Sequence, residues 1–388
     1  MNSQKELFSL KENTHYLNCA YKAPLLKSAE EACIKALIRE RNPSDIKPDD
    51  FFDEAEQVRS YFGQLINAHT SQIAIVPSVS YGMSSVMSNT KAKVGGNAIT
   101  VKEEFPSGYY ALEKWCKQHN NELSIVHPGD TNLIGESWNA NILNSIDEQT
   151  SVVLLSSVHW MNGIKFDLEA IGKKCKQVGA KFIVDGSQSV GAMEMDIDFY
   201  HIDALICAGY KWLFGPYSLS LVYLSEYYNE GYPIEETWMN RIQAGTFSDL
   251  NNYKADYKPG AARYNVGQTS NLIAMPILLE SLKQLNKWEP NHIQNYCAKL
   301  ITPLITYLKN LGVEIEGNDY FCSHLFSLQL PSEVDTEILK ENLFKNNVFV
   351  SVRGPYLRVS VNVFNDEKDI SKLITVIAET LNTNNNEI

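Results

Sequence analysis

The sequence predicts an α/β protein in which helices cover a mainly parallel sheet, followed by a smaller α/β domain. Short apolar runs alternate with helical stretches through the middle of the chain, a rhythm typical of βαβ units. The predicted strands are residues 73–76, 98–101, 123–126, 152–155, 182–184, 204–207 and 219–224. Because these runs are almost wholly apolar, we expect the sheet to be buried on both faces.

Helix signals lie before and between these strands. Ser28 opens the capping-box pattern Ser-Ala-Glu-Glu, and apolar residues then recur at helical spacing. A second amphipathic stretch covers residues 52–66, and Asp167 is a plausible N-cap for a helix over 167–178. We therefore expect a helical pair before the sheet and crossover helices within it.

The pattern changes after about residue 270, where long helical stretches precede short strands. The predicted helices are 272–285, 293–311, 336–346 and one from about 369, and the predicted strands are 325–330, 348–352 and 357–361. We expect a large domain over residues 20–270. A small domain would combine residues 1–19 with 271–388.

Composition narrows the class of protein. The chain has 388 residues, of which 44% are hydrophobic, and its net charge is −12, which disfavours a nucleic-acid partner. No run is apolar enough for a signal peptide or a membrane span, so we expect a cytoplasmic protein. Its seven cysteines are scattered without a CxxC pair, and we expect neither disulfides nor a metal site.

Candidate functional residues follow three of the predicted strands. Asp185 follows residues 182–184, Lys211 comes shortly after 204–207, and Ser80 and Tyr81 follow 73–76 at the start of a helical run. Since parallel sheets bind ligands outside the carboxyl ends of their strands, these residues should share one edge of the sheet.

This combination suits pyridoxal 5'-phosphate (PLP). A helix start with hydroxyl donors binds a phosphate dianion, and a buried carboxylate such as Asp185 keeps a pyridine nitrogen protonated. The amine of Lys211 could form a Schiff base with the aldehyde. Each feature alone also fits a helix cap, a salt bridge or a surface lysine, so the prediction depends on the three together.

Two segments resemble the class V aminotransferases. They are VDGSQSVGAMEMDI at 184–197 and ICAGYKWLFGP at 206–216. This superfamily includes cysteine desulfurases, selenocysteine lyases, kynureninases, phosphoserine aminotransferases and isopenicillin N epimerase. The resemblance extends over residues 15–370 and implies the PLP-dependent transferase fold type I, with a seven-stranded sheet in the large domain.

The resemblance also implies roles for single residues. Asp185 would pair with the ring nitrogen, Gln188 would hydrogen-bond the 3-hydroxyl group, and Lys211 would carry the cofactor. Ser80 and Tyr81 would bind the phosphate.

Further roles implied by the resemblance concern the rim of the site. Tyr210 would bind phosphate, and Phe105 would stack on the pyridine ring. Arg358 would bind the substrate carboxylate, with Arg353 as a weaker candidate. His159 and Trp160 would lie on the substrate side.

The resemblance extends to the assembly. Gln268 and Thr269 fall where some relatives reach the phosphate of the partner subunit. This position implies a homodimer with its active sites at the interface.

The chain departs from the family pattern at three places. Ala208 stands where a phosphate-binding serine is common. No cysteine occurs in the segment before Arg358, which argues against persulfide chemistry of the cysteine desulfurases. Kynureninases have histidine at the position of Gln188, which argues against a kynureninase activity as well.

These observations predict an aminotransferase that acts on the α-carbon of a small amino acid. A lyase of the C–S or C–Se type and an amino-acid epimerase remain alternatives, because one site can serve all three reactions. A non-catalytic protein on the same fold would be expected to lack Lys211 or Asp185. An NAD-dependent enzyme is disfavoured because no GxGxxG follows an early strand.

Overall fold

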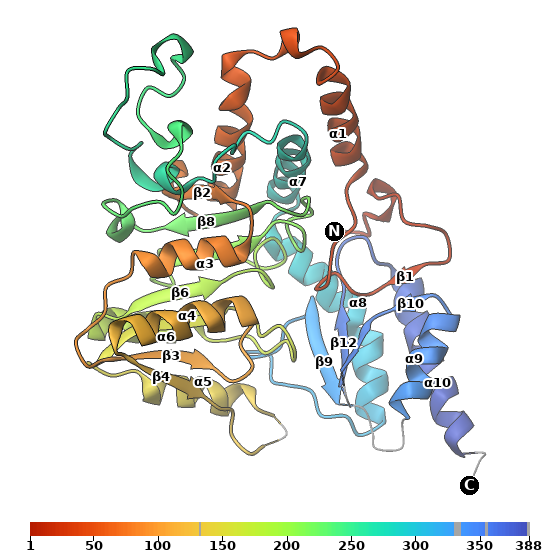
Figure 1. Ribbon diagram of the computed structural model, residues 1–388. Coiled ribbons are helices and arrows are strands. Elements are labelled where there is room, and N and C mark those ends of the chain that lie inside the picture. Colours follow the sequence, from red (N-terminus) through yellow and green to blue (C-terminus); the bar gives the residue numbers. More distant parts are fainter. Residues whose placement is uncertain (132, 330–334, 354–355, 386–388) are drawn as a thin grey trace.

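The structure is a computed structural model that describes residues 1–131, 133–329, 335–353 and 356–385 (Figure 1). A seven-stranded sheet forms the centre of the large domain, with strand order β2-β8-β7-β6-β5-β3-β4. Its strands are β2 (Ile73–Val76), β3 (Asn97–Val101), β4 (Glu122–Val126), β5 (Thr150–Ser156), β6 (Lys181–Asp185), β7 (Ala204–Ala208) and β8 (Ser220–Leu224). β8 runs antiparallel to both of its neighbours, β2 and β7, and the other neighbouring strands of the sheet pair in parallel. The predicted α/β fold with a mainly parallel sheet is confirmed.

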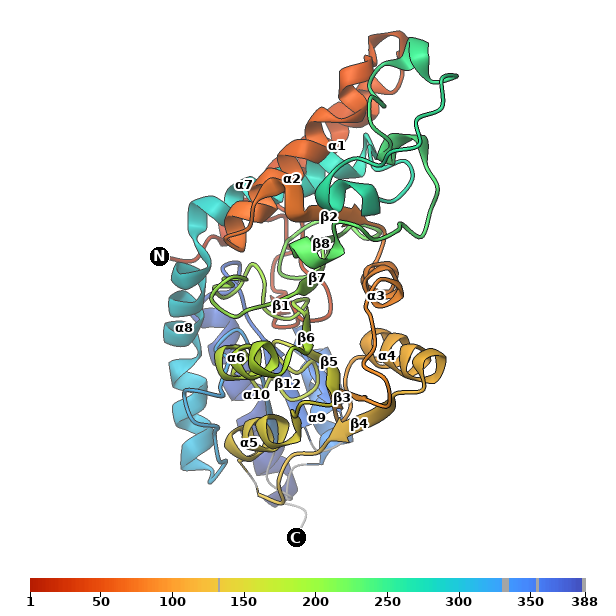
Figure 2. The ribbon, with the colours of Figure 1, turned by 90° about the vertical axis from the view of Figure 1, so that its left-hand side faces the viewer.

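Helices cover both faces of this sheet, as the alternation of buried side chains requires. In β5, Val153 and Leu155 join the core on one face, whereas Val152 and Leu154 join the core on the other. Figure 2 shows α3 (Val79–Ser88) and α4 (Pro106–His119) on one side of the sheet and α5 (Gly135–Ser145) and α6 (Leu168–Val178) on the opposite side.

The remaining α-helices flank the large sheet or belong to the C-terminal part of the chain. They are α1 (Lys27–Arg39), α2 (Asp53–Leu65), α7 (Ala274–Trp288), α8 (Pro290–Asn310), α9 (Thr336–Lys345) and α10 (Glu367–Asn385). Short 3-10 helices occur at Lys5–Leu7, Pro43–Asp45, Pro48–Phe51, Thr70–Gln72, Glu226–Tyr228, Trp238–Asn240, Phe247–Asp249 and Gly260–Tyr264.

Helix starts agree with the sequence prediction at α6 and differ at α1. The Ala170 N–H donates to the Asp167 carboxylate at 3.0 Å, so Asp167 is the N-cap of α6. The capping box predicted at Ser28 is wrong, because α1 begins one residue earlier, at Lys27. Ser28 therefore lies inside the first turn, and the N-cap Leu26 offers no side-chain acceptor.

Helix α3 lies unusually close to the sheet because of Gly82. A Cβ atom at this position would lie 2.9 Å from Val222 Cγ2 and 3.0 Å from Ile206 Cγ2. Glycine thus lets α3 approach β7 and β8, and the close approach brings the first turn of α3 to the carboxyl ends of the strands.

The C-terminal part contains two small sheets. β11 (Ser351–Arg353), β12 (Tyr356–Ser360) and β9 (Leu325–Gln329) form an antiparallel sheet. β1 (His15–Tyr16) pairs in parallel with β10 (Val348–Phe349). The single strand predicted at 348–352 is wrong, since its two halves pair with different partners and belong to different sheets.

The N-terminal segment lies beside the C-terminal elements in Figure 1. His15 Nδ1 lies 2.8 Å from Asp369 Oδ1, and Lys5 Nζ lies 3.0 Å from Asp366 Oδ2. These contacts join the N-terminal segment to the region at the start of α10. Helix α7 instead packs against α1 and α2, so a division at residue 271 stays a proposal.

None of the helices within the described residues combines the length and the hydropathy needed to cross a bilayer.

Candidate active site

A cavity of about 470 Å³ opens at the carboxyl ends of the central strands. Asp185, at the end of β6, and Lys211, in the loop after β7, both line it and are both buried. Its lining is Pro77, Ser78, Val79, Ser80, Phe105, Ser107, Ser156, Trp160, Asp185, Ser187, Gln188, Ala208, Tyr210, Lys211, Tyr217, Ser218 and Ser220. The size falls within the range of small-molecule sites, roughly 300–1,000 Å³.

Asp185 places a carboxylate at the base of the cavity. The Ser187 N–H donates to Asp185 Oδ1 at 2.8 Å. Burial raises the pKa of Asp185, while the hydrogen bonds from Ser187 and the positive charge of Lys211 lower it. The carboxylate and the lysine therefore interact electrostatically, and a cation placed near Asp185 would stabilise its charged form.

Lys211 projects its amine among aromatic rings. Its Nζ atom lies 5.4 Å from the centre of the Phe105 ring and 5.9 Å from that of Tyr210. The Phe105 ring in turn meets Trp160 edge to face, at 5.5 Å between ring centres. These aromatic walls shield the amine from bulk water and leave flat surfaces on which a ring can stack.

Two helix N-termini meet at one end of the cavity. Ser78 caps α3, since the Tyr81 N–H donates to its Oγ at 3.1 Å. Ser80 Oγ lies 2.8 Å from Ser107 Oγ, in the first turn of α4. The positive ends of two helices and two hydroxyl groups make this end suited to a phosphate.

Ser107 was missed by the sequence analysis, although a signal for it existed. It follows Pro106, and proline at the first helical position marks a helix start. Ser218 and Ser220 also line the cavity, near Ala208, and were missed as well. They are nearby hydroxyl groups that could replace the serine absent at position 208.

The side chain of Gln188 is held in one orientation. The Trp212 indole N–H donates to Gln188 Oε1 at 2.9 Å, and Gln188 Nε2 donates to the Ala20 carbonyl at 3.2 Å. His324 Nε2 donates to the backbone carbonyl of Gln188 at 2.7 Å. Burial lowers the pKa of His324 to about 4, so this ring is neutral near pH 7.

Tyr81 and Gln268 do not line the cavity. The Tyr81 hydroxyl is buried against the core on the α3 face and has no hydrogen-bond partner among the described residues. Burial raises its pKa to about 12. Gln268 is exposed and has a positive φ of 58°.

His159 also lies outside the cavity, packed between Trp138 and Phe166. Its Nδ1 lies 3.0 Å from Asn162 Oδ1, and its Nε2 lies 3.1 Å from the Glu103 carbonyl. Burial lowers its pKa to about 4, so it is a neutral core residue near pH 7. Its neighbour Trp160 does line the cavity.

Arg358 lies behind the cavity wall rather than in it. The guanidinium donates to the Trp160 carbonyl at 2.6 Å and to Ser351 Oγ at 3.2 Å. It thereby connects β12 of the small domain to the wall of the cavity. The side chain of Arg353 lies outside the described residues.

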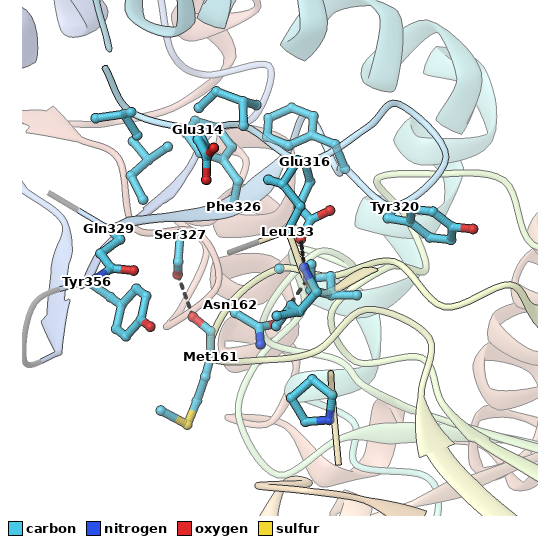
Figure 3. Close-up of a pocket in the computed structure, with 18 of the residues that line it drawn as sticks. Leu133, Met161, Asn162, Glu314, Glu316, Tyr320, Phe326, Ser327, Gln329 and Tyr356 are labelled. Atoms are coloured by element: carbon cyan, nitrogen blue, oxygen red, sulfur yellow. Dashed lines mark hydrogen bonds between the residues drawn. The ribbon is translucent and has the colours of Figure 1, made fainter. Parts of the chain in front are cut away.

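A second, more open cavity of about 890 Å³ is lined by residues from the 102–164 region and from the 311–329 region, together with Tyr356. Figure 3 shows Glu314, Glu316 and Tyr320 on one side of it and Met161 and Tyr356 near its other end. The Glu316 carboxylate accepts from the Ile134 and Gly135 N–H groups at 2.6 and 3.1 Å, so it caps the start of α5. The Glu316 carboxylate therefore has a structural role.

The first cavity fits PLP in each of its parts. It offers a buried acid for the ring nitrogen, an amine for the aldehyde, aromatic surfaces for the ring, and helix N-termini with hydroxyl groups for the phosphate. Across the described ranges, no group of three His, Cys, Asp or Glu side chains could hold a metal ion. The fold and this cavity define a PLP-dependent enzyme of fold type I.

Comparisons with known proteins agree with this class. Residues 47–373 match the family model described as Aminotransferase class-V. The chain belongs to this family of PLP-dependent enzymes, as the sequence resemblance predicted.

Relatives and solved structures of several activities are similar to the chain. Hercynylcysteine sulfoxide lyase of Schizosaccharomyces pombe is 23% identical, over 84% of this chain and 83% of that protein. Isopenicillin N epimerase of Streptomyces clavuligerus is 20% identical, over 82% of each.

Among solved structures, the cystine C–S lyase C-DES in complex with cysteine persulfide has a TM-score of 0.84 and 18% identity, covering 95% of this chain and 98% of the lyase. A mutant of C-DES carries glycine linked covalently to PLP. A cysteine desulfurase of Thermococcus onnurineus NA1 has a TM-score of 0.79 and 18% identity, covering 99% of each chain. These likenesses confirm the predicted fold type I.

Proposed function

We propose that the protein is an aminotransferase that acts on the α-carbon of a small amino acid. One observation carries the proposal: Asp185 and Lys211 are both buried and line the same cavity. An acid for the ring nitrogen and an amine for the aldehyde are the two groups that PLP chemistry requires.

Bound PLP supplies an aldehyde that binds amines covalently and a ring that takes up electron density from the substrate. Lys211 would provide the amine that holds the cofactor, and its amine is the base in the cavity that could take a proton from the α-carbon of a substrate. The Asp185 carboxylate would keep the ring nitrogen protonated. Phe105 and Trp160 limit the access of water to this region.

The remaining assignments concern binding. We propose that Ser80 and Ser107 bind the phosphate, with a contribution from the Tyr210 hydroxyl, and that Gln188 donates to the 3-hydroxyl group. Arg358 is proposed to bind the substrate carboxylate through its guanidinium fork. To do so, its buried side chain would have to move into the cavity from behind the Trp160 wall, where Nη1 donates to the Trp160 carbonyl.

A second candidate is a C–S lyase. The similarity to hercynylcysteine sulfoxide lyase favours it, and an epimerase is the third possibility in view of the similarity to isopenicillin N epimerase. No cysteine is found among the described residues that line the cavity, which argues against a persulfide mechanism that uses a protein thiol.

We also propose a homodimer in which Gln268 reaches the phosphate site of the partner, whereas Thr269 is buried and its hydroxyl donates to the Val266 carbonyl. The exposed position of Gln268 in a single chain is compatible with such a contact. Sedimentation of the purified protein would test this, and a monomer at micromolar concentration would contradict it. A cytoplasmic location stays a prediction from the sequence.

The reaction can be identified by incubating the PLP-loaded protein with single amino acids and a keto-acid acceptor. Mass spectrometry should detect amino transfer to the acceptor, with a matching keto acid from the donor. Pyruvate and a thiol from a cysteine conjugate would instead establish the lyase, and a racemised substrate would establish the epimerase. The Lys211→Ala variant serves as the inactive control.

A further inference from the structure

Glu104 is a buried carboxyl group at the edge of the cavity to which the sequence analysis assigned no role. It lies between the end of β3 and the start of α4 and is only 5% exposed. Carboxyl groups are seldom buried to this extent unless they are hydrogen-bonded, because removing a charge from water is costly. Its contacts therefore indicate what the group does.

The hydrogen bonds found for the Glu104 side chain all lead to residues of the cavity wall. Its Oε1 accepts from the Phe105 N–H at 2.6 Å and from the Ser156 hydroxyl. Its Oε2 accepts from the Ser156 N–H at 2.7 Å. Phe105 and Ser156 both line the cavity.

These contacts connect three strands of the site. Ser156 ends β5 and is paired in the sheet with Asp185, the last residue of β6. Glu104 follows β3, on the other side of β5. The Glu104 carboxyl group thus fixes two parts of the site. These are the aromatic wall at Phe105 and the end of β5, which lies beside Asp185.

The electrostatic environment of Glu104 sets it apart from an ordinary surface acid. Burial raises its pKa to about 7, and the Asp185 charge adds to the rise, while the donors from Ser156 and Phe105 oppose it. Hydrogen bonds to an ionised acceptor are stronger than those to a neutral one. A carboxylate therefore holds Phe105 and Ser156 more firmly than an uncharged group in the same place.

We propose that Glu104 is a positioning residue for PLP, which holds Phe105 and Ser156 so that the cofactor ring is fixed between the aromatic wall and Asp185. This inference rests on the proposed function, since it assumes that PLP binds beside Lys211. It adds a residue that does not line the cavity itself.

The test compares Glu104→Ala and Glu104→Gln with Glu113→Gln, a control on α4 whose partner is Lys117 at the surface. Near-visible circular dichroism of the bound cofactor reports how rigidly the ring is held, and titration gives the dissociation constant of PLP. We expect Glu104→Ala to lose at least half of the dichroism and to bind PLP about tenfold more weakly. Glu104→Gln should recover part of both, since one acceptor oxygen remains.

Wild-type dichroism and PLP affinity in a folded Glu104→Ala variant would overturn the inference. If that variant does not fold, Glu104→Gln and Ser156→Ala decide in its place, and unchanged dichroism in both would overturn it equally. Failure of the wild-type protein to bind PLP covalently would instead refute the proposed function. The two failures are therefore distinguishable.

Discussion

At the scale of single residues, Asp185 and Lys211 are the groups proposed to carry the chemistry, and the sequence alone predicted both. Each follows a short apolar strand, and neighbouring parallel strands bring their carboxyl ends to one edge. Chain order and strand direction were sufficient to predict that these residues lie close together. Only the structure shows that both are buried in one cavity.

Replacing Asp185 by asparagine tests the role of its charge. The amide keeps the size of the side chain but cannot hold a proton at the ring nitrogen, so activity should fall by roughly 10²-fold or more. Covalent binding of PLP should persist, because Lys211 is unchanged.

The matched control for Asp185→Asn is Asp203→Asn. Asp203 lies just before β7, at the opposite edge of the sheet, and pairs with Lys181 at 2.8 Å. Turnover measured with the same substrate should be close to that of the wild type in this control. An equal loss in both variants would show that the Asp185 effect is not specific to the site.

His324 makes stability depend on pH. In the unfolded chain this side chain takes up a proton below about pH 6.5, whereas in the folded protein it stays neutral down to about pH 4. The unfolded state therefore binds more protons between these values, and the free energy of unfolding falls as the pH falls.

Between pH 7 and pH 5, His324 should lower the free energy of unfolding by about 2 kcal/mol. At pH 5 the pH lies about 1.5 units below the pKa of this side chain in the unfolded protein, and each unit is worth about 1.4 kcal/mol. Urea unfolding of wild type and His324→Gln at both pH values checks this. Glutamine can still donate to the Gln188 carbonyl but does not titrate. If both proteins lose the same stability between pH 7 and pH 5, the account of His324 is wrong.

At the scale of elements, apolar periodicity predicted the strands and helices closely. The errors concern where elements begin and end, which depends on hydrogen bonds. The cap at Asp167 was predicted correctly because its carboxylate is the acceptor available where α6 begins. Ser28 was misplaced because α1 continues one residue further toward the N-terminus. The division between β10 and β11 depends on distant partners, which a local pattern cannot show.

Asp167 and Ser28 provide a paired test of the assigned helix starts. Asp167→Ala should destabilise the protein by about 1 kcal/mol, since it removes the N-cap of α6. Ser28→Ala should change the free energy of unfolding by less than about 0.5 kcal/mol, because alanine is at least as good a helix former inside the first turn. Urea unfolding of both variants would measure the difference, and equal losses would contradict the assigned helix start.

At the scale of the whole molecule, the site contains more than the sequence could indicate. Ser107, Ser156 and Glu104 come from different elements, and the sequence alone assigned a role to none of them. Their roles arise from β3, β5 and α4 meeting at one edge, which is a property of the tertiary structure.

Four residues expected at the site lie outside the cavity in a single chain: Tyr81, His159, Arg358 and Gln268. His159 and Trp160 follow the same strand, and the chain direction after β5 sends one side chain into the core and the other to the cavity. Arg358, in β12, lies behind Trp160 and donates to its carbonyl. The proposed role of Gln268 involves a second chain.

The central claim is that PLP is bound covalently by Lys211 beside Asp185. Reduction of the PLP-loaded protein with borohydride, followed by peptide mass spectrometry, tests it most directly. The account predicts a pyridoxyl group on Lys211 in the wild-type protein and its absence in Lys211→Ala. A pyridoxyl group on another lysine, or none at all in a protein saturated with PLP, would contradict it.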